Sequence, residues 1–438
     1  MTKGKVLFAF IALGLIAVVF LFFSVENTID IPGPVGEIIE QVVEVVKPVV
    51  DPNADVEKQQ PLASKPDIVK AVYVTGYAAG SASKMAHIND ILDTTEINAV
   101  VLDVKDYTGM VSYEPDVEEV KKYGAFEKRI PKINTLIKSF HDRGVYVIGR
   151  IAVFQDQVLV KARPELALQS SSTGEVWRDY KKVAWLDTGS REVWDYNIAI
   201  AQDALDRGFD EVNFDYIRFA SDGNLKDIRY PFFDESTLKH TTLKKFFEYV
   251  REKLASARLS ADLFGLVTET YDGMGIGQVL EDSFMPFDYA APMTYPSHYA
   301  SGYRGFAKPA TRPYEVMKFA MDAALSRLTT FNLQLQAAAQ AAASSSASSS
   351  EKLKANSLQL TARSRFRPWI QDFDLGADYT AGMVRAQIQA IYDAGCSATV
   401  NASGTIASVR TSPCSEYIDG FMVWNPSNVY TKEAFLKE

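Results

Sequence analysis

The chain has 438 residues, 47% of them apolar, and a formal net charge of −9. This length suits one large domain or two medium ones, and the apolar fraction is ample for a core. The acidic balance argues against a nucleic-acid-binding protein, which needs a basic face to neutralise phosphates. No two of the four histidines stand at the spacing of metal ligands, so a His-rich metal site is not expected.

The first 26 residues have the pattern of a membrane anchor. Lys3 and Lys5 precede an unbroken apolar run from Val6 to Phe23. As a helix this run is about 27 Å long, enough to cross the hydrocarbon core, and its basic flank should stay in the cytoplasm. A cleaved signal peptide is the alternative, but no small-x-small cleavage pair follows Phe23. We therefore expect residues 1–26 to anchor the chain with the remainder outside the cytoplasm.

Residues 27–66 are rich in proline, valine and glutamate. This composition predicts a flexible stalk with no fold of its own.

From residue 67 onward, eight apolar runs alternate with helical patterns. The runs are Ala71–Tyr77, Ala99–Val104, Val145–Val153, Glu211–Phe214, Asp262–Val267, Tyr289–Met293, Arg367–Ile370 and Gly420–Trp424. Strands of this kind are buried on both faces and belong to a parallel sheet. Eight of them in about 360 residues favour an α/β fold, a closed (β/α)₈ TIM barrel over residues 67–438.

The connections that follow four of the strands are long. They cover Lys105–Arg129, Phe154–Gly189, Tyr216–His240 and Thr294–Arg312. Loops after the strands build the active face of this fold, so the asymmetry indicates where a functional site lies.

Two further segments interrupt the pattern. Ala337–Ser350 is of low complexity and is predicted to be a flexible insertion ahead of the seventh strand. Ser397–Pro413 is rich in Ser, Thr and Ala and is flanked by Cys396 and Cys414. In an oxidising compartment the two cysteines are expected to form a disulfide, and two unrelated free thiols are the alternative.

Polar and aromatic side chains gather at the predicted strand ends, with one histidine and no cysteine among them. Serine or cysteine catalysis would need a nucleophile beside His298, and no G-x-S-x-G turn exists. A Schiff base at Lys105 would require this lysine to lose its proton. Lys105 stands between two aspartates, whose negative charges would keep it protonated. Two carboxylates flanking a scissile bond are then the natural chemistry. The residues expected to bind substrate are Asp103, Lys105, Arg150, Arg218, Tyr295, His298, Trp369, Trp424 and Asn425.

Each of these residues also has a structural interpretation. An aspartate in an apolar strand needs a partner, because an unpaired buried carboxylate is costly. The available pairs are Asp103 with Lys105 or Arg150, and Asp215 with Arg150 or Arg218. Asp262 can pair within its own strand, and Trp369 and Trp424 can be core residues instead of sugar platforms.

Motifs along the barrel resemble a known bacterial family. They are Asn98–Asp106, Gly208–Phe219, Ser260–Gly265, Met274–Gln278, Pro292–Tyr299, Arg367–Phe373 and Val423–Asn428. The family is the "putative glycosyl hydrolase domain", a TIM-barrel domain of unknown function that is distantly similar to the α-amylase-like hydrolases. The resemblance covers nearly all of residues 69–430 and implies the same fold and a glycoside hydrolase activity.

The resemblance also suggests catalytic positions. In amylase-like hydrolases the nucleophile ends strand four, the acid/base lies on strand five and a third carboxylate ends strand seven. By position these are Asp215, Asp262 and Asp372. The chain departs from that pattern in having Asp on strand five, near the start of the predicted strand. Either Asp262 or Glu269, which lies further toward the carboxyl end of that strand and is the substitute acid, is therefore expected as the acid/base.

These observations lead to one main hypothesis and two alternatives. The main hypothesis is a membrane-anchored, extracytoplasmic glycoside hydrolase that acts on cell-envelope or extracellular polysaccharide and needs no cofactor. A barrel that binds glycan without cleaving it is the first alternative. A carboxylate metal site made of Asp103, Asp106 and Asp215 is the second.

Overall fold

The computed structural model describes residues 54–345, 361–396 and 409–437. The predicted anchor and most of the predicted stalk lie outside these residues. Among the helices in the described part of the chain, none combines the length and the apolar composition that a membrane crossing requires.

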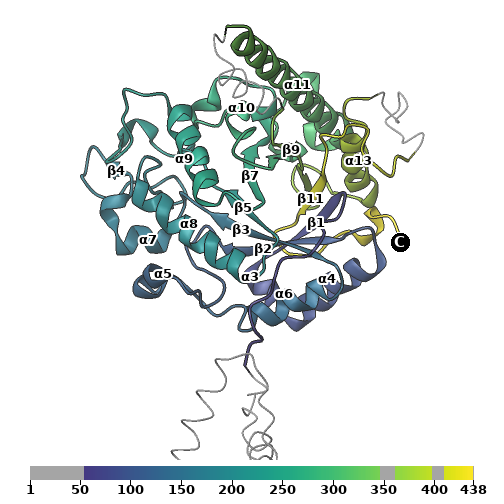
Figure 1. The fold of residues 1–438 in the computed structure, drawn as a ribbon, viewed down its shortest axis with the longest axis horizontal. Helices are drawn as coiled ribbons and strands as arrows, with labels where there is room; N and C mark the ends of the chain where they lie inside the picture. The colour runs from purple at the N-terminus through teal and green to yellow at the C-terminus, as the bar shows by residue number, and fades with distance from the viewer. Residues whose placement is uncertain (1–53, 346–360, 397–408, 438) are drawn as a thin grey trace, which may run out of the picture. The chain divides into compact units, whose positions relative to one another are not determined.

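Eight parallel strands close into a barrel, which confirms the predicted (β/α)₈ fold (Figure 1). The strands follow the order β1, β2, β3, β5, β7, β8, β10, β11, and pairing between β8 and β10 and between β11 and β1 closes the ring. Their bounds are Val69–Val74, Ala99–Lys105, Tyr146–Ala152, Glu211–Asp215, Leu259–Phe264, Tyr289–Met293, Trp369–Gln371 and Gly420–Trp424. Three short strands lie beside them: β4 (Gln169–Ser170), β6 (Ile228–Arg229) and β9 (Arg365–Phe366).

Helices surround the strands (Figure 1). The α-helices are α3 (Gly76–Ala79), α4 (Ala82–Thr94), α5 (Glu118–Tyr123), α6 (Ile133–His141), α7 (Gln157–Ala162), α8 (Arg191–Asp206), α9 (Lys239–Lys253), α10 (Leu280–Ser283), α11 (Pro313–Ser345) and α13 (Ala381–Tyr392). The 3₁₀ turns are η1 (Pro164–Leu166), η2 (Leu225–Asp227), η3 (Gly265–Thr268), η4 (Gly273–Gly275), η5 (Pro296–His298), η6 (Tyr303–Gly305), η7 (Pro309–Thr311) and η8 (Lys432–Ala434).

Side chains alternate between the outer and the inner face of each strand, and this alternation produces two hydrophobic cores. On β3, Val147 and Ile151 face outward and pack in the shell between the barrel and its helices. Tyr146 and Ile148 face inward and pack in the barrel interior. Because successive side chains of a strand point to opposite faces, Arg150 also faces inward, toward the carboxyl end of the barrel.

Two differences between the predicted and the observed strand bounds bear on the site. β7 begins at Leu259, three residues before the predicted start, so Asp262 lies past the middle of this strand and not at its beginning. The predicted seventh strand, Arg367–Ile370, begins only at Trp369 as β10, and β9 ends at Phe366. Pro368 lies between the two, and its ring removes a ladder donor.

The predicted flexible insertion at Ala337–Ser350 begins inside α11, a helix of 33 residues that ends at Ser345. The prediction was therefore wrong for residues 337–345. Alanine has the highest helix propensity of all residues, and no Gly or Pro interrupts the run that follows Pro313.

The described end of the predicted stalk is bound to the barrel. Asp55 accepts the N–H groups of Asn134 and Thr135 at 2.9 and 2.8 Å and so caps the first turn of α6. Leu62 packs against the interior core of the barrel. Lys65 pairs with Asp419, immediately before β11, at 3.0 Å. Within residues 55–65, Asp55 thus caps a helix, Leu62 packs in the interior core and Lys65 provides a counter-ion.

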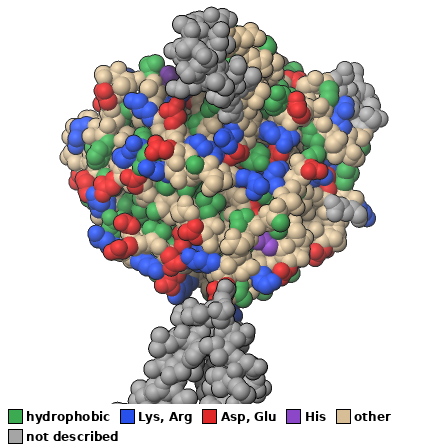
Figure 2. All heavy atoms as spheres, viewed as in Figure 1, with side chains coloured by type: hydrophobic (Ala, Val, Ile, Leu, Met, Phe, Trp, Pro, Cys, Tyr) green, Lys and Arg blue, Asp and Glu red, His purple; other side chains and the backbone are tan. Residues whose placement is uncertain are grey.

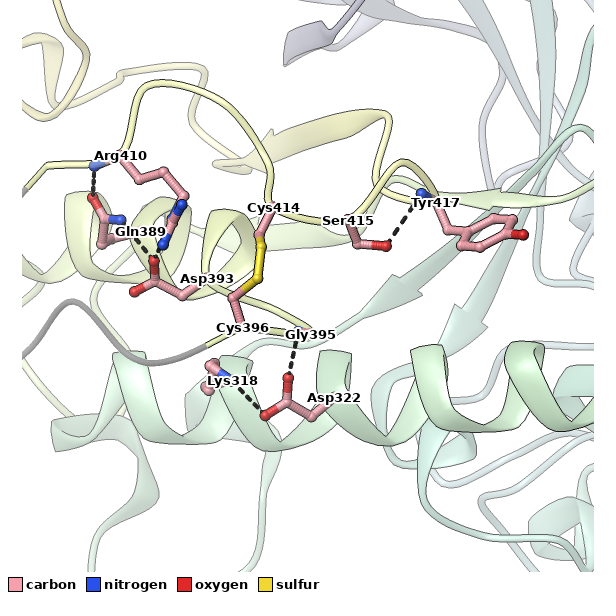
Figure 3. Close-up of a disulfide and its surroundings, with 10 residues drawn as sticks. All are labelled: Lys318, Asp322, Gln389, Asp393, Gly395, Cys396, Arg410, Cys414, Ser415 and Tyr417. Atoms are coloured by element: carbon pink, nitrogen blue, oxygen red, sulfur yellow. Dashed lines mark hydrogen bonds and ion pairs between the residues drawn. A yellow bond between two sulfur atoms is a disulfide. The ribbon is translucent and has the colours of Figure 1, made fainter.

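The predicted disulfide joins Cys396 and Cys414, with Cα atoms 6.2 Å apart (Figure 3). Next to it, Asp322 of α11 accepts the N–H of Gly395 at 2.9 Å. Arg410 donates to Asp393 at 3.0 Å on the other side. The bond therefore ties the chain after α13 to the segment that leads into β11.

Charges of both signs share the surface. Figure 2 shows one face, on which Lys and Arg side chains lie next to Asp and Glu side chains over much of its area. Pairs such as Arg251 and Arg363 with Asp288, at 2.6 and 3.2 Å, balance charge locally.

We predict that replacing both cysteines, Cys396→Ser with Cys414→Ser, lowers the free energy of unfolding by about 3 kcal/mol, because the bond closes a loop in the unfolded chain. Urea unfolding of the oxidised protein and the double variant measures the difference. Reductant should lower the stability of the wild type by a similar amount and leave the variant unchanged. Equal stabilities of the oxidised protein and the variant would contradict the prediction.

Candidate active site

Neighbouring strands carry polar side chains into the barrel near their carboxyl ends. These side chains are Tyr73 on β1, Asp103 on β2, Arg150 on β3, Asp215 on β5 and Asp262 on β7. The parallel register aligns Asp103 with Arg150 and Phe214 with Ala261. The next residues, Asp215 and Asp262, are therefore neighbours on adjacent strands with both side chains pointing inward.

The guanidinium of Arg150 binds two carboxylates. Its Nη1 donates to Asp103 Oδ1 at 2.6 Å, while Nη2 and Nε donate to Asp215 Oδ2 at 2.5 and 3.2 Å. The hydroxyl of Tyr73 donates to the second oxygen of Asp103 at 2.5 Å. Burial opposes the positive charge, but Asp215 and Asp103 raise the pKa of Arg150 well above its usual value. Arg150 therefore stays charged and fixes both carboxylates.

Asp215 ends β5, and the backbone bends sharply after it. Asp215 Oδ1 accepts the N–H of Tyr216 at 2.6 Å. Tyr216 has a φ of 52°, a conformation that is uncommon for a residue other than glycine. Strained backbone of this kind occurs most often at functional sites, which makes the segment after β5 a candidate.

Asp262 has a different environment. Its Oδ1 accepts from Trp369 Nε1 at 2.7 Å and from Asn213 Nδ2 at 2.9 Å. Its Oδ2 has no hydrogen-bond partner and lies 3.8 Å from Arg150 Nε. Burial and then the charge of Asp215 raise the pKa of Asp262 well above its usual value. Asp262 therefore keeps its proton to a higher pH than an ordinary aspartate.

The two carboxyl groups are close together. Asp215 Oδ2 and Asp262 Oδ2 lie 3.2 and 3.8 Å from the same atom, Arg150 Nε, so they are at most about 7 Å apart. Carboxyl pairs at such distances serve as the catalytic pair of glycosidases.

Gln278 fixes the two strand ends that carry this pair. Its Nε2 donates to the carbonyls of Ile217 and Asp262 at 3.2 and 3.3 Å, and its Oε1 accepts the N–H of Phe264 at 2.9 Å. The glycine-rich turn of residues 273–277, which contains η4, immediately precedes Gln278 and leads the chain to this position.

A cavity of about 680 Å³ lies beside the polar side chains of the strand ends and is bordered by Arg150, Asp215 and Asp262. Aromatic side chains supply much of its wall: Tyr216, Phe264, Tyr295, Tyr299, Tyr303, Trp369 and Trp424. Trp424 is stacked on Tyr73 with ring centroids 4.0 Å apart, and Arg150 lies 5.1 Å from the Trp424 ring. A concave, largely apolar wall with a few convergent polar groups is the usual form of a small-molecule site.

Eight of the residues proposed from the sequence line this cavity. They are Arg150, Asp215, Arg218, Asp262, Tyr295, His298, Trp369 and Trp424. Burial lowers the pKa of His298, whose Nδ1 is 3.0 Å from Ser297 Oγ. Tyr216 and Tyr299 also line the cavity and lie within the family motifs, but neither was predicted from the sequence to bind substrate.

Two residues expected to bind substrate lie behind the cavity wall. Asp103 contacts Arg150 and Tyr73, as its structural interpretation predicted. Lys105 is fully buried and donates to Asp156, the N-cap of α7, at 2.7 Å. A register shift between Asp103 and Lys105 accompanies this placement. The expectation that Lys105 contacts substrate is therefore corrected.

Glu269, the expected substitute acid, is outside the cavity wall. Because β7 ends at Phe264, the chain turns into η3 and Glu269 follows that turn. Its carboxylate accepts from Tyr303 and Arg304, both at 2.5 Å. Glu269 thus holds the loop that carries Tyr303.

Asp372 and Asn425 belong to a second pocket of about 550 Å³. Asp372 accepts from the N–H and the hydroxyl of Thr431 at 2.8 and 2.7 Å, and Asn425 donates to its backbone carbonyl. The third carboxylate suggested by the resemblance therefore does not join the pair formed by Asp215 and Asp262.

The carboxylate metal site does not form in the described part of the chain, where no group of three or more His, Cys, Asp or Glu residues is arranged to hold an ion. Arg150 occupies the space between Asp103 and Asp215, and Asp106 pairs with Arg129 at 2.6 Å.

The fold and the cavity define a (β/α)₈ barrel with a carboxyl pair at the carboxyl ends of its strands, the arrangement of a glycoside hydrolase-like domain. The chain belongs to the family described as "Putative glycosyl hydrolase domain", whose model matches residues 71–348. The match ends ahead of β10 and β11. No curated protein matches the chain.

Two solved structures are similar. A hypothetical protein from Ruminiclostridium thermocellum ATCC 27405 is 40% identical over 44% of this chain and 96% of its own, with a TM-score of 0.41. The PgaB (BpsB) glycoside hydrolase domain from Bordetella bronchiseptica is 14% identical over 84% of this chain and 99% of its own, with a TM-score of 0.52. The second similarity shows the shared fold.

We predict that Asp262→Asn becomes more stable relative to the wild type as the pH rises. The pKa of Asp262 is raised in the folded protein, so the stability that the proton provides is present at low pH and is lost as the pH rises through the folded-state pKa. The asparagine cannot lose a proton. Urea unfolding at several pH values measures the difference, with the exposed Asp222→Asn as the control. A difference that is independent of pH would count against the assignment.

Proposed function

We propose that the protein is a glycoside hydrolase that acts on polysaccharide through Asp215 and Asp262. The observation that carries the proposal is that two adjoining carboxyl groups in one aromatic cavity have opposite surroundings. Asp215 faces the guanidinium of Arg150 at 2.5 Å, whereas Asp262 is 1% exposed and has one oxygen without a partner. Separate environments of this kind assign one carboxyl group as acid and the other as base or nucleophile.

In this mechanism Asp262 donates its proton to the glycosidic oxygen as the bond to the anomeric carbon breaks. Asp215, held by Arg150, is the carboxylate that either attacks that carbon or stabilises its developing positive charge. Water supplies the hydroxyl group of the product and restores the proton. Arg150 positions Asp215, and the aromatic wall provides faces on which sugar rings stack.

A glycan-binding barrel without hydrolysis is the second candidate, and one observation favours it. Both oxygens of Asp215 already accept hydrogen bonds, from Arg150 and from the N–H of Tyr216. A carboxylate held in this way can serve as a fixed anion that shapes the cavity.

We predict that Asp215→Asn abolishes hydrolysis and preserves binding. The substitution keeps the size of the side chain and removes its charge, so turnover should fall by roughly 10²–10⁴-fold or more. The assay is release of reducing ends from a panel of bacterial exopolysaccharides and peptidoglycan fragments, with binding followed by affinity electrophoresis. The exposed Asp222→Asn serves as the control. Hydrolysis that survives in Asp215→Asn would refute the catalytic assignment, and binding without turnover in the wild type would support the second candidate.

The dependence of the hydrolysis rate on pH, measured in the same assay, tests the role of Asp262. Because Asp262 acts in its protonated form, the rate should fall as the pH rises through its raised pKa. Asp262→Asn should lose most of the turnover, and its remaining rate should no longer fall as the pH rises through this range.

We further propose that Val6–Phe23 anchors the protein in a membrane with the barrel outside the cytoplasm, next to cell-envelope or extracellular polysaccharide. The apolar run and its basic flank support this orientation. The disulfide supports an oxidising compartment.

The anchor predicts that the full chain sediments with membranes and that deletion of residues 1–26 releases a folded barrel into the soluble fraction. Cell fractionation followed by intact-mass measurement is the test. A soluble mature chain that begins after Phe23 would show a cleaved signal instead of an anchor.

A further inference from the structure

Arg218 is the second arginine of the cavity, and its surroundings differ from those of Arg150. It stands three residues after Asp215, in the strained segment that follows β5. Its guanidinium carbon lies 4.6 Å from the centre of the Trp185 ring and 4.7 Å from that of Phe264. Aromatic rings therefore orient the guanidinium plane at the cavity wall.

The hydrogen bonds of Arg218 use only one of its nitrogens. Nη1 donates to the carbonyl of Phe219 at 3.1 Å and to Ser221 Oγ at 3.0 Å. Nε and Nη2, which form one edge of the guanidinium, have no partner in the described part of the chain. Neither nitrogen is among the fully buried polar atoms that lack a hydrogen-bond partner. Both are therefore accessible, and this edge borders open space at the cavity wall.

No carboxylate of the described residues lies within ion-pair distance of Arg218. Arg150 contacts two aspartates in the same cavity, and the buried Arg367 contacts Glu211 and Asp419. A cation held among aromatic rings without a counter-ion is costly, since burial disfavours its charge. The cost is offset when a ligand supplies the missing anion.

We propose that Arg218 binds a carboxylate of the substrate through its Nε and Nη2 edge, so that the cavity selects acidic sugars such as uronic acids. The two N–H groups of this edge are parallel and match the two oxygens of a planar carboxylate. The same edge of Arg150 already binds a carboxylate, since its Nε and Nη2 both donate to Oδ2 of Asp215. Nη1 of Arg218 is anchored on the protein, so the edge is held in place before the ligand arrives.

This inference rests on the proposed function for its sugar ligand, but binding alone tests it. The probes are oligosaccharides of glucuronic, galacturonic and mannuronic acid, each beside its carboxyl-reduced neutral form. The protein is the full chain in detergent, and binding is measured by calorimetry. We expect at least one acidic oligosaccharide to bind roughly 10- to 100-fold more tightly than its reduced form, as a charged hydrogen-bonded pair requires. Added salt should reduce the preference.

Three variants assign the preference to Arg218. Arg218→Met keeps an apolar stem against Trp185 and should bind the acidic and reduced forms equally. Arg218→Lys keeps the positive charge but lacks the two parallel N–H donors, so it should retain part of the preference. Arg178→Met removes an exposed arginine that also has no ion pair in the described residues and lies outside the cavity wall, so the preference should survive. Circular dichroism confirms that each variant is folded.

The outcomes separate this inference from the proposed hydrolysis. Equal binding of acidic and reduced forms by the wild type, or no binding of any acidic form, overturns the role of Arg218. A preference that persists in Arg218→Met also overturns it. A preference that is lost in Arg218→Met but accompanied by no turnover supports the carboxylate site and contradicts the hydrolase.

Discussion

The contact of Arg150 with Asp103 and Asp215 determines the chemistry of the barrel. If all three carboxyl groups of this layer were ionised around its one guanidinium, two negative charges would lack a counter-ion. A proton kept on one carboxyl group halves this excess, and buried net charge is costly. Arg150 contacts Asp103 and Asp215 at 2.6 and 2.5 Å, so its hydrogen bonds go to these two residues and not to Asp262. Asp262, 3.8 Å from the same guanidinium, is the group that keeps its proton. The difference between the paired carboxyl groups thus follows from which of them the single guanidinium binds.

A second buried ionic layer supports this one from the amino ends of the strands. Arg367 binds Glu211 at 2.9 Å and Asp419 at 2.6 Å, and Lys65 approaches Asp419 at 3.0 Å. Leu62 packs against the apolar layer between the two, which includes Ile148. Residues 62–65 therefore neutralise and cover an end of the barrel that would otherwise admit water. Pro61 and Pro66 flank them in a proline-rich stretch whose composition resembles that of a linker, which is why the sequence predicted a stalk.

The sequence predicted the barrel well because buried parallel strands leave continuous apolar runs, and it predicted most of the cavity because each run ends in polar residues. Each of its errors has an identifiable structural cause. Lys105 turns away at a register shift, and Glu269 lies beyond the end of β7 because that strand begins three residues earlier than predicted. Asp372 meets Thr431, a contact 59 residues away in sequence that no local pattern reveals. Strand boundaries and long-range partners depend on tertiary packing, whereas periodicity does not.

The strained backbone at Tyr216 connects the two parts of the candidate site. A non-glycine residue with φ of 52° costs on the order of 1–3 kcal/mol and persists only where the surroundings require it. Here the N–H of Tyr216 donates to Asp215, while the chain that follows brings Arg218 to the cavity wall. An extended residue at this position would continue β5 and direct the next side chains away from the barrel mouth. A glycine would remove the strain but also the Tyr216 ring, 6.1 Å from Trp185 in the aromatic group that orients Arg218. The strain at one residue therefore places the carboxylate proposed for catalysis and the guanidinium proposed for recognition in the same cavity.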